Sequence, residues 1–315
     1  MAEETKVRHT LSEQAARQLA NTTKTPPQWD GITPRWLVSF LPWVPVEAGT
    51  YRVNRVKETK VEIAGGDVEC SPRDGKDLPE TFVDYEEKPR EYTLNAVTTV
   101  LDVQTRVSDL YAHPMDQIRE QLRLIIEKVK EKQEEELVNN AEYGLLRHVA
   151  PSMRLKTRKG PPTPDDMDEL ISKVWKEPAF FLAHPRAIAA FGRECTRRGV
   201  PPPTAALFGS QFLTWRGLPL VPCDKVHVAG KPGEKSGKTS ILLLRTGEKK
   251  QGVVGLFQPG IPGEVTPSLS VRFMGINHKA IASYLISLYC SAAILTEDAI
   301  GALEDVEVGH YHEYA

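Results

Sequence analysis

The sequence has few cysteines, and none of them form a recognisable motif. Only four occur in 315 residues, and no two have the C-x-x-C spacing. Structural zinc sites and disulfide-stapled domains need cysteines in clusters. We therefore expect free thiols in a reducing cytoplasm, where cysteines act as small core residues. The four are Cys70, Cys195, Cys223 and Cys290.

Long apolar runs and an excess of one charge are also missing. Because no stretch reaches about 18 consecutive apolar residues, no membrane span is expected. The first ten residues lack the apolar core of a signal peptide. The 40 basic and 42 acidic residues nearly cancel, which gives no general case for a nucleic-acid or anionic membrane partner. The length suits one large domain or two medium ones with a sizeable core.

Motifs that carry catalysis are absent as well, including G-x-S-x-G and H-E-x-x-H. The segment 228–240 is the nearest approach to a phosphate-binding loop, G-x-x-x-x-G-K-[ST]. Gly237-Lys238-Thr239 supplies its end, but Pro232 stands where the first glycine belongs. A phosphate loop should also lead into a helix, whereas a buried strand is predicted here. We interpret 228–240 as a hairpin loop.

The histidines do not form a metal-binding pattern. His310 and His312 with Glu313 are too few ligands for a structural metal site. His184 precedes Pro185 and is predicted to be a structural residue in a strand–helix turn. The sequence therefore offers no catalytic, cofactor-binding or metal-binding residue. We predict that the protein is not an enzyme and holds no cofactor.

The sequence does contain one long predicted helix, from His113 to Asn140. Five apolar residues recur every three or four positions and share one face. Pro114 suits the first helical turn, and about 27 residues span roughly 40 Å. This pattern fits a surface helix over a core, a short coiled coil, or a strut in a flat subunit. The apolar residues are Met115, Ile118, Leu122, Ile125 and Val129.

Proline and tryptophan are concentrated near the N-terminus, after a short helix predicted at 10–24. Residues 25–57 contain five prolines and Trp29, Trp36 and Trp43. Proline forces extended or turn backbone. Tryptophans on such a segment are typical of an arm that packs into grooves on a neighbouring subunit. The alternative is a segment that lies over its own core.

Strand patterns occur at both ends of the next region, 51–112, and a polar stretch separates them. From position 67 to 91 this stretch carries nine acidic and four basic residues. Such a long connection with so few core-forming residues is unusual inside a compact domain. We interpret it either as disordered or as an extended two-stranded loop that another subunit orders.

A helix that ends near Ala150 is predicted after the long helix, followed by a basic, proline-rich loop. No aromatic residues are interleaved with the basic ones, so we interpret a solvated loop rather than a nucleic-acid site. The basic residues are Arg154, Lys156, Arg158 and Lys159.

From Pro164 onward the pattern becomes α/β. Helices are predicted at 165–177 and 185–199, and Gly199 is placed to end the second. A short buried strand is predicted at 179–185, and further strands at 211–228, 240–245 and 251–258. Mixed strands and a short helix at 269–308 complete the fold.

This order of elements resembles the capsid fold of phage Hong Kong 97. Several stretches are also similar to the family 2, subtype A encapsulin shell proteins, which include sulfur-starvation-associated nanocompartments and "major membrane protein I" sequences. The tryptophan- and proline-rich arm is the most specific of these stretches. The matching segments are 17–25, 33–57, 101–124, 209–225 and 275–308.

The resemblance implies an α+β, HK97-like subunit divided in chain order. Its parts would be an N-terminal arm, an extended loop (E-loop) with flanking strands, a P-domain with a spine helix, an A-domain, and a closing P-domain strand with the C-terminus. The implied bounds are 1–50, 51–112, 113–163, 164–290 and 291–315.

The resemblance also implies function. The chain would self-assemble into a closed icosahedral T=1 shell of about sixty copies in the cytoplasm. The shell would lack an active site and would enclose a cargo enzyme, a pyridoxal-phosphate cysteine desulfurase, in sulfur metabolism or storage. The alternatives are a phage-type major capsid protein, which packages DNA, and a soluble nucleotide-binding protein that uses 228–240.

Overall fold

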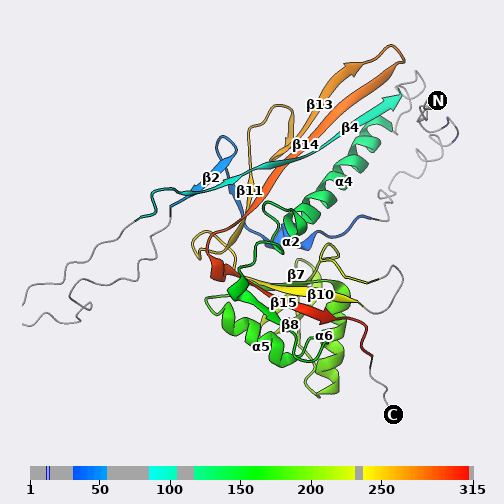
Figure 1. Ribbon diagram of the computed structural model, residues 1–315. Coiled ribbons are helices and arrows are strands. Elements are labelled where there is room, and N and C mark those ends of the chain that lie inside the picture. The colour runs from blue at the N-terminus through cyan, green and yellow to red at the C-terminus, as the bar shows by residue number, and fades with distance from the viewer. Residues whose placement is uncertain are drawn as a thin grey trace, which may run out of the picture.

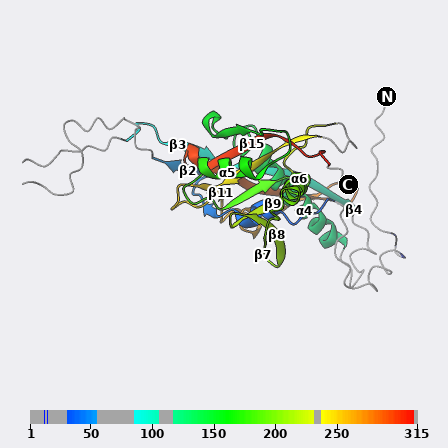
Figure 2. The same ribbon diagram turned by 90° about the horizontal axis from the view of Figure 1, so that it is seen from below.

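The computed structural model shows two large sheets joined side by side, with a small two-stranded ribbon at their boundary (Figure 1). Seen from below, the described elements form a flattened body from which the β7–β8 hairpin projects (Figure 2). Most of the helix predicted at 10–24 and most of the acidic stretch lie outside the described residues. The structure describes Ser12, Gln14, and residues 31–54, 85–104, 117–230 and 237–311.

The first unit, the six-stranded unit, is a sheet with one long helix along it. The helix α4 (Gln117–Asn139) lies beside β4 and β14 (Figure 1). Its apolar stripe, including Leu122, Ile125 and Val129, packs against Leu101 and Ile286. The predicted long helix is confirmed over α4. The strands are β1 (Trp43–Pro45), β11 (Val253–Phe257), β14 (Ile281–Ile294), β13 (Leu269–Ile276), β12 (Glu264–Thr266) and β4 (Asn95–Gln104).

The second unit, the seven-stranded unit, is a mixed sheet packed against α5 (Pro164–Lys173) and α6 (Pro185–Arg197). Every residue of β6 is buried, as its continuous apolar run predicts. In spatial order the strands are β5 (Arg154–Lys156), β15 (Ile300–Glu307), β10 (Lys238–Leu244), β6 (Phe180–Ala183), β9 (Leu218–Pro222), β8 (Ser210–Trp215) and β7 (Thr204–Leu207).

The predicted starts of both helices and the predicted end of α6 are confirmed, whereas α5 ends at Lys173, before the predicted end at 177. Thr163 caps α5 through a capping box with Asp166, which satisfies two backbone N–H groups. His184 caps α6, because its Nδ1 accepts a hydrogen bond of 3.1 Å from the Arg186 N–H. Gly199 follows α6 with φ of 70°, a conformation that favours glycine.

The helix predicted to end near Ala150 is wrong, because residues 141–150 form turns. The chain folds back on the end of α4. The Leu145 N–H donates to the Leu137 carbonyl at 2.9 Å. A Cβ at Gly144 would come within 2.4 Å of the Asn140 backbone. Only glycine permits this close approach.

The prediction that the basic residues after Ala150 lie in a solvated loop is also wrong in part. Arg154 and Lys156 belong to β5, which pairs with β15. The Arg154 guanidinium lies 2.5 Å from the Glu304 carboxylate. Arg158 lies 3.3 Å from buried Asp166. These basic side chains are therefore matched by carboxylates of their own subunit.

The tryptophan- and proline-rich segment packs on its own core from residue 31 onward. The short helix α2 (Trp36–Phe40) places Trp36 edge-on to Phe212, with ring centroids 5.1 Å apart. Trp43 lies in β1, and its ring packs against the backbone of Gly255, where a larger residue would have its Cβ. Of the two interpretations of this segment, the structure favours the one that lies over its own core, because Trp36 and Trp43 contact residues of the same subunit.

Sheet membership does not follow the linear division into an A-domain at 164–290 and a closing strand after 290. Strands β11 to β14 lie in the six-stranded unit, and β15 lies in the seven-stranded unit. The reason is that the chain crosses between the sheets twice after residue 164. It leaves after β10 and returns through the short 3-10 helix η2 (Glu297–Ala299).

Candidate functional site

Buried charged side chains gather where α4 meets α2 and the loop that follows β9. The helix contributes Glu127, Glu131 and Glu134, which are spaced three or four residues apart and therefore share one face. The sequence alone presents this as the solvated face of a helix. In the structure it is covered, and we call this region the junction.

Glu131 is the most heavily bonded group of the junction. It accepts hydrogen bonds from the Thr33 N–H at 2.8 Å and the Thr33 hydroxyl at 2.9 Å. The Lys225 ammonium lies 3.0 Å away and the Arg35 guanidinium 3.1 Å away. Burial by itself would raise the pKa of Glu131, but the bonds from Thr33 and Lys225 lower it below its ordinary value. Glu131 thus fastens both segments to α4 as an anion.

Glu134, one turn further along, has a different setting. Only 1% of it is exposed, and it accepts a hydrogen bond of 3.0 Å from the Leu37 N–H. Among the described residues, no lysine or arginine nitrogen lies within ion-pair distance of it. Burial raises the pKa of Glu134 to about 7, and nearby Glu131 and Asp224 also act to raise it.

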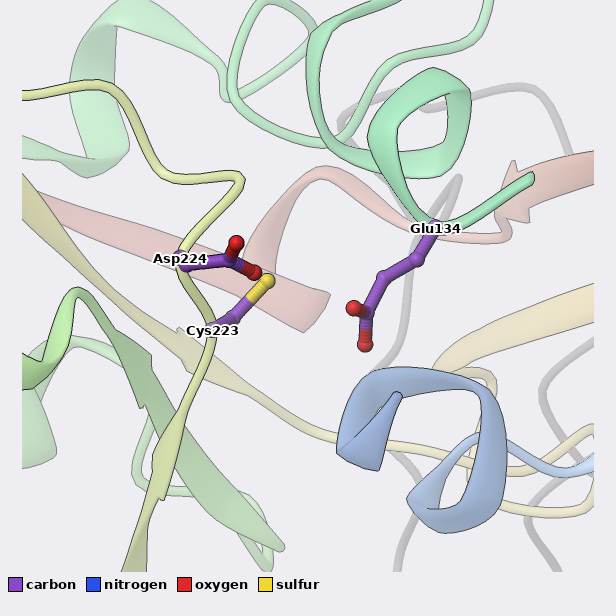
Figure 3. Close-up of side chains that lie close together, drawn as sticks. All are labelled: Glu134, Cys223 and Asp224. Carbon is purple, nitrogen blue, oxygen red and sulfur yellow. The ribbon is translucent and has the colours of Figure 1, made fainter. Parts of the chain in front are cut away.

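Glu134 points from α4 toward the loop that carries Cys223 and Asp224, with α2 beside it (Figure 3). Donor atoms of these three side chains lie within 4.8 Å of one another, close enough to share a cation. The Lys225 ammonium already supplies a cation 2.8 Å from Asp224. Burial raises the pKa of the Cys223 thiol to about 12, so it stays protonated and is a poor ligand. We assign no metal to the junction.

The other candidate positions are structural where they are described. Ala229 and Lys238 exchange backbone hydrogen bonds of 2.7 and 2.9 Å, and Lys238 leads into strand β10. The hairpin interpretation of 228–240 is confirmed at these two ends, and residues 231–236 lie outside the described part. His310 accepts a hydrogen bond at its carbonyl from Arg193. His312 and Glu313 lie outside the described residues.

The described cysteines behave as core residues. Cys195, Cys223 and Cys290 are free and buried. Burial raises the pKa of the Cys195 thiol to about 11 and that of Cys290 to about 12. Thiols in this state are unreactive at neutral pH. Cys70 lies outside the described residues.

An apolar tip on β13 is a surface that sequence reasoning missed. Phe273, Met274 and Ile276 are each more than half exposed. Among the described strands, β12 pairs only with the start of β13, so the outer edge of 272–276 has no strand partner. Unpaired, apolar edges favour association with another chain. The sequence signal was two adjacent large apolar residues, which break the alternation of an ordinary strand.

Comparison with known proteins shows what kind of protein has this architecture. A family model described as "Type 2A encapsulin shell protein SrpI-like" matches residues 47–310. The chain belongs to this family. The encapsulin is 65% identical to the type 2A encapsulin shell protein SrpI of Synechococcus elongatus, over 96% of both chains.

Solved structures agree with this assignment. The encapsulin matches a chain of the holo-SrpI encapsulin complex from Synechococcus elongatus with a TM-score of 0.82 and 62% identity. That match covers 97% of this chain and 99% of the other. The capsid of an empty GTA particle matches with a TM-score of 0.61 at 14% identity, over 94% and 99% of the two chains. The second match shows the fold alone.

The predicted family and the α+β, HK97-like fold are therefore confirmed. The protein is a structural, cage-forming shell subunit and not an enzyme. Helix α4 is the spine helix of this fold. The ribbon of β2 (Thr50–Val53) and β3 (Arg90–Thr93) is the described base of the E-loop. No helix in the described ranges has the length and apolar character needed to cross a membrane.

Proposed function

We propose that this encapsulin forms a closed T=1 icosahedral shell of about sixty subunits in the cytoplasm. The shell encloses a cargo enzyme, a pyridoxal-phosphate-dependent cysteine desulfurase, and serves sulfur metabolism or storage. The observation that carries the proposal is the match to a holo encapsulin complex over nearly the whole of both chains. The cargo class comes from the family resemblance.

The shape of the subunit supports a shell made of flat tiles. The described elements lie in one flattened body (Figure 2), and the apolar tip of β13 ends in solvent. A monomer rarely leaves such an edge open. In a closed shell, contacts between copies cover these edges, and the interior needs no catalytic group of its own.

Particle mass and contents test the proposal separately. Sixty copies of 35.1 kDa would form a particle of about 2.1 MDa, which sedimentation and electron microscopy measure directly. Mass spectrometry of particles purified from the native cell should then identify a cysteine desulfurase. A particle of this size with a different enzyme inside would overturn the cargo and keep the shell.

The absorbance ratio at 260 and 280 nm distinguishes the phage-type alternative. An absorbance ratio typical of protein is expected for an enzyme-filled shell. A ratio typical of nucleic acid would indicate packaged DNA. Ion pairing of Arg154 and Arg158 within the subunit agrees with the first outcome, because a DNA-lined lumen benefits from free basic groups.

A further inference from the structure

Glu134 holds together three segments that are far apart in the sequence. It projects from α4, bonds the backbone of α2, and faces the loop after β9 (Figure 3). No side chain of α2's own segment caps this helix at its N-cap residue, Arg35. The Glu134 carboxyl supplies an acceptor for the Leu37 N–H, 97 positions away. Its charge state therefore bears on all three segments at once.

The charges around Glu134 compensate an anion there only in part, because Lys225 acts to lower its pKa while Glu131 and Asp224 act to raise it. Arg35 is engaged by Glu127 at 2.7 Å and by Glu131. Lys225 is engaged by Glu131 and Asp224. The charged and titratable groups around the carboxyl come from three segments: Glu127 and Glu131 from α4, Arg35 from the α2 segment, and Cys223, Asp224 and Lys225 from the loop.

With Lys130, which lies 3.4 Å from Glu127, three cations face three other carboxylates before Glu134 is added. An ionised Glu134 would be a fourth anion, buried and without a direct cation. Burying a charge without a partner is costly. Protonation removes that cost, while the carboxyl oxygen can still accept from the Leu37 N–H.

We propose that the junction is a proton-sensitive joint: the subunit binds a proton at Glu134, holds α2 and the β9 loop most firmly in that state, and loosens as the pH rises from acid to neutral. The proposal concerns the subunit and does not depend on the identity of the cargo.

The direction follows from proton linkage. The pKa of Glu134 is about 7 in the folded chain, above the ordinary 4.5. Between these values the folded state binds a proton that the unfolded state has released. Rising pH then lowers the folded-to-unfolded ratio by up to about tenfold per pH unit, and the loss levels off above pH 7.

Other groups near the junction titrate outside this window or with the opposite sign. The pKa of Glu131 is lowered and that of Lys225 is raised from its alkaline ordinary value. Burial lowers the pKa of His184, which also interacts with Asp224. That histidine therefore makes stability rise with pH. The wild-type profile mixes these effects, so the difference from a Glu134 variant carries the test.

The test compares full-length particles of wild type and Glu134→Gln by urea unfolding between about pH 5 and pH 8. Glutamine keeps an acceptor for Leu37 and cannot ionise. We expect the stability ratio of variant to wild type to rise by up to about a hundredfold between pH 5 and 7. Glu135→Gln is the matched control, because Glu135 is half exposed and pairs with Lys132. It should follow wild type. Parallel profiles for wild type and Glu134→Gln would overturn the proposal.

A second measurement uses the wild type alone, in case Glu134→Gln does not fold. Hydrogen exchange of the α2 amides, corrected for the intrinsic pH dependence of exchange, should show protection that falls as the pH rises from about 5 to about 7 and then levels off. The amides of β6, which is fully buried in the seven-stranded unit, provide the internal reference. Protection of the α2 amides that stays the same across this pH range would also overturn the proposal.

Discussion

The two units of the subunit differ in how completely they bury their apolar side chains. In the seven-stranded unit, β6 and most of β10 are buried between α5, α6 and the neighbouring strands. In the six-stranded unit, α4 covers one face of a narrow sheet, and the far end of β13 is exposed. The first unit completes its own core. The second leaves large apolar side chains exposed at the far end of β13.

The two connections between the units differ in the same way. At η2, buried Arg245 pairs with Asp298 at 2.8 Å, and Lys176 also lies 2.8 Å from that carboxylate. At the junction, Glu134 has no such cation among the described residues. At η2, two cations share Asp298 and keep it ionised at neutral pH, whereas the junction carries a carboxyl that titrates near neutrality.

The largest effect should come from the centre of the seven-stranded unit. Phe181 is fully buried in β6 between β9 and β10. Phe181→Ala should cost about 3–5 kcal/mol in the free energy of unfolding, because it leaves a cavity. Val100→Ala on half-exposed β4 is the control and should stay within about 0.5 kcal/mol. Urea unfolding measures both. Similar losses for the two variants would show that the units do not differ as described.

The charge-paired connection comes next. Asp298→Asn should cost about 2–3 kcal/mol, since it leaves the buried Arg245 guanidinium poorly compensated. Arg245 and Lys176 hold the pKa of Asp298 far below its ordinary value. The stabilisation is therefore complete above the ordinary value of 3.8 and is lost as the pH falls below it.

Unfolding of both proteins in urea from neutral to acid pH checks this prediction. The gap between wild type and Asp298→Asn should narrow only below about pH 4. Glu297→Gln, with a contact of 3.9 Å to Arg90 on exposed side chains, should have little effect. A gap that is unchanged in acid would contradict the charge-pair explanation.

A smaller effect is expected where the arm meets the six-stranded unit. A Cβ on Gly255 would come within 2.7–2.9 Å of the Trp43 ring. Gly255→Ala should cost about 1–3 kcal/mol by overpacking. In a Trp43→Ala background the cost should vanish, which a double-mutant cycle measures. Gly192→Ala, where nothing lies within 4 Å, should be neutral or stabilising. An unchanged cost in the double mutant would mean that Trp43 does not pack there.

The smallest effect on the isolated fold should come from the apolar tip. Phe273→Ser with Ile276→Ser should change the free energy of unfolding by about 0.5 kcal/mol or less, because both side chains are exposed. The same pair should reduce the fraction of full-size particles in sedimentation. Val200→Ser, an exposed apolar position in the seven-stranded unit, is the control. Wild-type particle yield from the double variant would exclude the tip from assembly.

Local signals explain the parts that sequence reasoning predicted correctly. The turn at His184, the glycine after α6 and the dense apolar run of β6 each act within a few residues. The turns at 141–150 were missed because hydrogen bonds to α4 carbonyls outweigh the local helical pattern. The sequence left open whether the arm packs on its own core or on a neighbouring subunit, because its partners, such as Phe212 and Gly255, are remote in sequence.

The sequence by itself determined the long spine helix, the buried strands, the absence of catalytic motifs and, through resemblance, the encapsulin shell family. Only the tertiary structure decided that the charged face of α4 is covered, and that Glu131 is paired while Glu134 has no cation partner among the described residues. The physical reason is range. Periodicity acts over a few residues, whereas the desolvation of a carboxylate depends on segments that folding brings together from about a hundred positions away.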